Sequence, residues 1–139
     1  MSMVLPVWPD AEELVMALLR QAPALAPTVT QTTPPNLGDN GPVIQVLRVG
    51  GTDDGITDRP LVEVAVFAPS YKQAIGIAEQ VRQRMLGAGG TRVPTPTYPD
   101  GVLVDRCVTA TSPQEVPYDN PELRRKLATY QVELRRPRS

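Results

Sequence analysis

Side chains that commonly carry out chemistry are scarce in this 139-residue chain. It has one cysteine, Cys107, and no histidine. A cysteine nucleophile normally needs a neighbouring base, and a zinc site needs several cysteine or histidine ligands. We therefore predict that Cys107 is a small packing residue in a strand. We also expect no catalytic residues, no metal site and no cofactor, which makes catalysis the least supported class of function.

Two loops contain residues that could bind ions. Asp53, Asp54 and Asp58 crowd one predicted loop and offer oxygen ligands for a hard cation, but their spacing does not match an EF-hand. Aspartate and glycine are common in turns, so we interpret this segment as a solvated hairpin loop. The glycine cluster 87–90 follows a predicted helix, whereas a phosphate-binding loop precedes one. We interpret it as a helix end and a loop.

The charge is small overall and unevenly distributed. The net charge is −1 and the isoelectric point is about 5.4, so no basic field over the whole chain indicates nucleic-acid binding. From Asn120 onward, however, six residues are basic and two are acidic. This end could contact phosphate or an acidic partner, or it could simply be solvated. No signal peptide or membrane-spanning run is evident, so we expect a soluble protein made in a cytoplasm.

The element that organises the prediction is a strand followed by a helix in residues 59–86. Alternate residues of 61–68 are apolar on one face, and Ser70 is suited to cap the helix that begins at Tyr71. The helix has an apolar arc of Tyr71, Ala74, Ile77, Ala78, Val81 and Met85. Gly76 lies on its polar face. There it is either a tolerated imperfection or a point where another chain approaches closely.

Further elements follow from capping and periodicity. A first helix begins after Pro9, where Asp10 and Glu13 have capping-box spacing. Strands are expected at 27–33 (an edge strand), 43–49, 61–68, 102–111 and 127–135, with loops at 50–60, 92–100 and 113–121. The fold class is α+β, with two main helices packed on a mainly antiparallel four- to five-stranded sheet. We expect a single domain, 1–139, ending in a flexible tail, 136–139.

Two segments, 98–105 and 115–135, resemble the C-terminal half of tail terminator proteins of long-tailed (siphovirus-type) bacteriophages, in particular those infecting actinobacteria. The residues that carry this resemblance are Tyr118, Asp119, Asn120, Pro121, Arg124, Arg125, Ala128, Tyr130 and Val132. The order of the other elements agrees along the whole chain. These motifs are structural rather than catalytic.

The resemblance implies a non-enzymatic virion protein. Members of the tail terminator family form a homohexameric ring that caps the head-proximal end of the tail tube, stops tube polymerisation and offers a surface to the head connector. Implied partners are other copies of the chain, the major tail tube protein, the head–tail connector protein, and genomic DNA that passes through the lumen without sequence recognition. No membrane partner is implied, and assembly takes place in the host cytoplasm.

We expect the contacts with neighbouring subunits or the tube to lie on segments 50–60, 87–100 and 120–138. The candidate contact residues are Asp53, Asp54, Asp58, Arg92, Tyr118, Asn120, Pro121, Arg124, Arg125 and Arg135. Tyr130 either orders the last segment or belongs to the core. Two alternatives remain open: another head–tail connector or head-completion protein of the neck, and a small α+β ligand-binding domain or enzyme.

Overall fold

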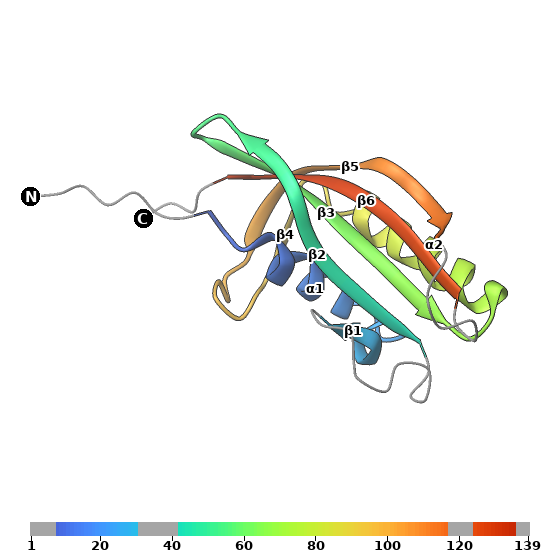
Figure 1. The fold of residues 1–139 in the computed structure, drawn as a ribbon. Coiled ribbons are helices and arrows are strands. Elements are labelled where there is room, and N and C mark those ends of the chain that lie inside the picture. Colours follow the sequence, from blue (N-terminus) through green and yellow to red (C-terminus); the bar gives the residue numbers. More distant parts are fainter. Residues whose placement is uncertain (1–7, 31–41, 117–123, 136–139) are drawn as a thin grey trace, which may run out of the picture.

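The computed structural model describes residues 8–30, 42–116 and 124–135. Its elements are α1 (Ala11–Arg20), the short 3-10 helix η1 (Ala26–Thr28), β1 (Val29–Thr30), β2 (Val43–Asp53), β3 (Thr57–Ala68), α2 (Tyr71–Leu86), β4 (Thr91–Val93), β5 (Val102–Glu115) and β6 (Arg124–Arg135). The sheet order is β1-β2-β3-β6-β5-β4. Both helices cover one face of this curved sheet (Figure 1). The α+β class is confirmed: five strands pair antiparallel, and the two-residue β1 adds a parallel edge.

The first helix begins where its cap predicts. The Asp10 carboxylate accepts hydrogen bonds from the backbone N–H groups of Glu12 and Glu13, at 2.9 and 3.3 Å. Glu13, however, does not reach back to complete a capping box. Its carboxylate instead accepts hydrogen bonds from the backbone N–H and the hydroxyl of Thr97, at 2.9 and 3.0 Å. The capping-box half of the prediction is wrong, because a loop distant in sequence offers Glu13 two donors.

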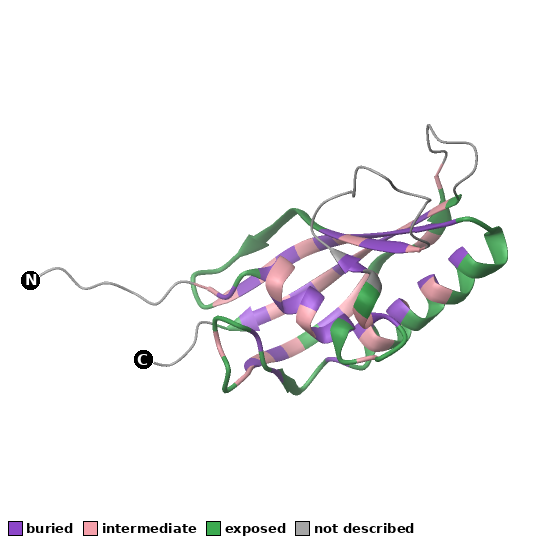
Figure 2. Ribbon diagram, turned by 90° about the horizontal axis from the view of Figure 1, so that it is seen from below, coloured by how far each residue is buried: buried purple, intermediate pink, exposed green. Residues whose placement is uncertain are grey.

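The strand–helix unit is confirmed. The inward residues Val62, Val64 and Val66 are at most 1% exposed, and the Ser70 hydroxyl accepts from the Gln73 N–H at 3.1 Å. Figure 2 shows the buried stripe along the inner side of α2. Tyr71 departs from the predicted apolar arc. Its ring is half exposed and lies 4.7 Å beneath the ammonium group of Lys126, since it occupies the first position of the helix.

The largest error concerns the segment 50–60, which we expected to be a long mobile loop. The β2 and β3 strands extend through it, and only residues 54–56 lie between them. Gly51 allows this because it stands opposite Pro60 with φ of +120°, and a Cβ there would lie 2.7 Å from the Pro60 Cα. Glycine in this position permits close strand pairing rather than a loop.

The edge formed by β4 and β5 also differs from expectation. Residues 91–93 form a short strand where a loop was predicted, and β5 continues through Pro113 to Glu115. An irregularity at Asp105 shifts the register, so that Cys107 rather than Arg106 turns inward, opposite Val132. Cys107 is therefore a buried packing residue, as predicted, and burial raises the pKa of its thiol to about 12.

A second apolar cluster lies on the face of the sheet that is opposite the helices. Val43, Ala65 and Phe67 form it, with Leu127 packed against them. The main core lies between the sheet and the two helices and contains the fully buried Tyr130. Among the described residues, no helix is long and apolar enough to cross a membrane.

Candidate subunit-contact surfaces

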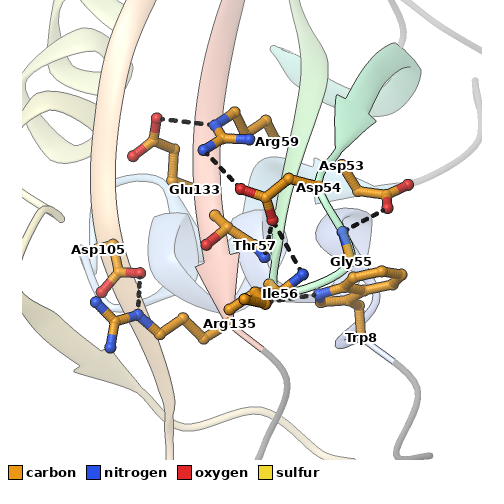
Figure 3. Close-up of polar contacts among 10 residues, drawn as sticks. All are labelled: Trp8, Asp53, Asp54, Gly55, Ile56, Thr57, Arg59, Asp105, Glu133 and Arg135. Carbon is orange, nitrogen blue, oxygen red and sulfur yellow. Dashed lines mark hydrogen bonds and ion pairs between the residues drawn. The ribbon is translucent and has the colours of Figure 1, made fainter.

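The tip of the β2–β3 hairpin, residues 53–57, is a tightly ordered turn (Figure 3). The Asp54 carboxylate accepts hydrogen bonds from the N–H groups of Thr57 and Ile56, at 2.7 and 3.0 Å. These two bonds, led by that of Thr57, lower the pKa of the Asp54 carboxyl. Asp53 accepts from the Gly55 N–H, and the Trp8 indole N–H donates to the Ile56 carbonyl. The expected exposure of Asp53 and Asp54 is confirmed, but the segment is a hydrogen-bonded turn rather than an irregular loop.

Charged contacts link this tip to the neighbouring strands. Arg59 pairs with Asp54 at 3.3 Å and with Glu133 of β6 at 3.4 Å. Farther along the sheet, Arg135 pairs with Asp105 of β5 at 2.7 Å. Figure 3 shows these pairs as a row that begins at the hairpin and crosses β6 to β5. The row is solvent-accessible, so each pair contributes little stability by itself and mainly orients its side chains.

Asp58 does not belong to the solvated tip. Its side chain is buried on the helix side of β3, where both carboxylate oxygens accept from the Arg48 guanidinium, at 3.0 and 3.1 Å. Bidentate geometry of this kind is strong and directional. We therefore assign Asp58 to the interior of the subunit, and the earlier placement of this residue on an exposed loop is wrong. Within the described ranges, no group of three or more acidic, histidine or cysteine side chains is arranged to hold a metal ion.

The opposite edge of the sheet holds a cavity of about 670 Å³. It is lined by Pro9, Arg92, Thr97, Tyr98, Pro99, Asp100, Gly101, Val102, Leu103 and Arg135. The predicted contact residue Arg92 is exposed on β4 and has no ion-pair partner in the part of the chain that the structure describes. The cavity therefore combines apolar walls with charged residues, of which Arg92 has no ion-pair partner among the described residues, while Asp100 and Arg135 also line it.

The first turn of α1 connects these two edges. Glu12 accepts from the backbone N–H of Arg48 at 2.8 Å, on the unpaired side of β2. Glu13 holds Thr97 in the loop that lines the cavity. The Thr97 N–H is the main cause that lowers the pKa of the Glu13 carboxyl. Adjacent carboxylates thus bind the hairpin on one side and the 95–101 loop on the other.

The remaining candidates lie near the start of β6. Arg124 is exposed and pairs with Glu115 at 3.0 Å, and the Arg125 carbonyl accepts from the Val116 N–H at 2.9 Å. Both residues therefore help to close the β5–β6 pair within the subunit. Tyr118, Asn120 and Pro121 lie outside the described residues. Tyr130 is a core residue and is 0% exposed.

Sequence reasoning missed the apolar component of the hairpin. Leu47, Val49 and Ile56 are exposed, by 37%, 51% and 71% respectively. Leu47 and Val49 belong to the predicted strand 43–49, whose apolar residues were expected on both faces, but Ile56 fell in the segment 50–60 that was predicted as a loop. The sequence therefore did not show that all three lie on one hairpin. The link from Glu13 to Thr97 spans 84 residues, and no local signal could have shown it.

Comparisons with known proteins give two results. A family model described as a phage tail termination protein matches residues 7–139. Among solved structures, a chain from the virion of a native gene transfer agent particle is similar, with a TM-score of 0.66 and 12% identity. The alignment covers 90% of this chain and 94% of that chain, and at this identity it shows a shared fold. No curated protein matches the sequence.

Proposed function

Because the chain belongs to the phage tail termination protein family, we propose that it forms a ring that ends the growth of the tail tube. The family match makes the chain a structural protein of the phage tail, and the formation of a ring is what we propose in addition. Six copies would cap the head-proximal end of the tube, stop its polymerisation and offer the opposite surface to the head connector. The observation that supports this proposal best is the extent of the family match, which includes every described helix and strand.

The surfaces of the subunit are compatible with such an assembly. A closed ring needs two different patches on each copy, related by a rotation that closes. We propose the hairpin tip and the cavity beside Arg92 as two such patches: the tip belongs to β2 and β3, and the cavity lies beside β4 and β5 and reaches Arg135 of β6. The partners we propose are other copies of the chain, the tail tube protein and the head connector, with DNA passing through the lumen without sequence readout.

The test uses the purified chain alone and mixed with the tail tube protein of the same phage. Negative-stain microscopy and light scattering should show six-fold rings, or tubes that become capped and shorter as the chain is added. A compact monomer that leaves tube length unchanged would contradict termination and favour a connector role instead. An Arg124→Ala/Arg125→Ala variant tests the sequence-based placement of these arginines at an interface. It should fold as the wild type does, because the Arg124–Glu115 pair is exposed and the Arg125 contact is made by its backbone carbonyl, but it should assemble or dock less well; normal assembly would exclude both arginines from the interface.

A further inference from the structure

The hairpin tip displays apolar surface that the subunit itself leaves uncovered. Ile56 is 71% exposed at the turn, and Val49 is 51% exposed on the adjoining part of β2. An edge strand that presents bare hydrophobic side chains is an aggregation hazard unless a partner covers it. Beyond residues 44–45, β2 has no strand partner on its outer side in the described ranges. This apolar surface is suited to contact another protein.

The tip is also preorganised for binding. Its turn is held by the hydrogen bonds to Asp53 and Asp54, and its backbone is attached to Trp8. A rigid element loses little conformational entropy on docking, so more of its contact energy appears as affinity. Ile56 is therefore presented in a fixed position rather than on a loose loop.

The cavity at the other edge fits this side chain in both size and chemistry. Its volume of about 670 Å³ is ample for an isoleucine side chain, and Tyr98, Pro99 and Leu103 provide apolar walls. Arg92 stands at the same cavity with its charge unpaired among the described residues. An apolar side chain could pack against these walls, and an acidic residue beside it could form an ion pair with Arg92.

Charge also favours contact between unlike edges. Asp53 is exposed at the tip, and its carboxylate accepts a hydrogen bond from the Gly55 N–H, with no ion-pair partner among residues 8–30, 42–116 and 124–135. Arg92 and Arg106 are exposed at the β4–β5 edge and have no described ion-pair partner. The Asp53 carboxylates of two hairpin tips would repel each other, whereas Asp53 of one copy would be attracted to Arg92 and Arg106 of another. Charge thus disfavours a two-fold dimer and favours head-to-tail packing, which can close into a ring.

From these observations we propose that the β2–β3 hairpin tip of one copy inserts Ile56 into the Tyr98–Leu103 cavity of the next copy, with Asp53 facing Arg92. The inference rests on the proposed ring and specifies which surfaces form it. The occupant of the cavity is thus a second copy of this chain.

The test is a charge swap read out by ring formation on tail tubes. Asp53→Arg and Arg92→Glu should each reduce the yield of rings by about tenfold or more, because each places like charges in contact. The double variant should restore rings. An equal mixture of the two single variants should restore them too, because the altered side of each variant meets the complementary side of the other. Lys72→Glu is the matched control, since it also replaces a positive charge by a negative one but does so on the exposed face of α2, away from both proposed surfaces.

The outcomes separate this inference from the proposed function. If wild-type rings cap the tubes and both single reversals assemble normally, the inference is wrong while termination stands. If the single variants fail and neither the double variant nor the mixture recovers, the specific pairing is also wrong. If the wild type forms no rings and leaves tube length unchanged, the proposed function fails as well. An Ile56→Ser variant with intact unfolding stability but weakened rings would support the insertion of this side chain.

Discussion

Replacing Tyr130 by phenylalanine should stabilise the subunit, although it removes a polar group from the centre of the core. Tyr130 is 0% exposed and packs in the main core. Its hydroxyl is buried and finds no hydrogen-bond partner among the described residues. An unsatisfied buried polar group costs about 1–3 kcal/mol, and removing it leaves a void smaller than a methyl group. We expect a net gain of roughly 1 kcal/mol in the free energy of unfolding.

The assay is denaturant unfolding at pH 7, where the midpoint should rise while the slope with denaturant stays constant. For a chain of this length, the melting temperature should rise by roughly 3–5 °C. Tyr71→Phe is the matched control, because its ring is half exposed and its hydroxyl removal should change stability by less than about 0.5 kcal/mol. A loss of more than about 1 kcal/mol in Tyr130→Phe would refute the reasoning, since it would show that the hydroxyl has a partner.

The alkaline range provides a second, independent readout of the same side chain. Burial raises the pKa of Tyr130 to about 12, whereas the unfolded chain should titrate near its ordinary value of 10. Between these values the unfolded state loses its proton first, so the wild-type stability falls as pH rises. At pH 11 this loss is about 1 kcal/mol. The advantage of Tyr130→Phe should therefore be larger at pH 11 than at pH 7.

Three further predictions concern the subunit. Glu13→Gln should lose roughly 0.5–1 kcal/mol at pH 7; hydrogen bonds from Thr97 lower the Glu13 pKa, so the wild-type advantage should be complete above the ordinary value of 4.5 and be lost as the pH falls through the lowered pKa in denaturant titrations. Gly76→Ala should raise the unfolding free energy by about 1 kcal/mol, because a Cβ there meets nothing within 4 Å; an unchanged or lower midpoint would contradict this. Arg48→Met should cost about 2–3 kcal/mol because it leaves the buried Asp58 carboxylate unpaired, and adding Asp58→Leu should recover most of that loss in thermal unfolding; no recovery would count against the pairing.

Local patterns predicted the elements whose structure is decided locally. The Asp10 and Ser70 caps, the valine alternation of 61–68 and the inward residues of 127–135 all lie where periodicity placed them. Each of these signals depends on neighbours within one turn or one strand pair. For the same reason, the α+β class could be predicted from the sequence.

The errors arose where a distant residue changes the meaning of a local pattern. Gly51 is typical of a loop, yet it is needed because Pro60 of the partner strand approaches too closely for a side chain. The irregularity at Asp105 occurs in the pairing with β6, and it turns Cys107 rather than Arg106 toward the interior, which strict alternation along the strand does not predict. Glu13 has the spacing of a capping box, but its carboxylate instead accepts a hydrogen bond from Thr97, which is 84 residues away in the sequence. The contact surfaces combine such distant segments and could not be assembled from the sequence.

The adjacent carboxylates in the first turn of α1 have a geometric consequence for any closed assembly. Glu12 accepts a hydrogen bond from β2 and Glu13 accepts one from the loop beside the cavity, so this turn, together with the sheet that joins them, helps to set the angle between the two edges of the subunit. In a ring built head to tail, that angle sets the number of copies needed to return to the start. In such a ring, a subunit that lost the hydrogen bonds of Glu12 and Glu13 would therefore be expected to give rings of mixed size, or open spirals, even though each contact between subunits remained intact.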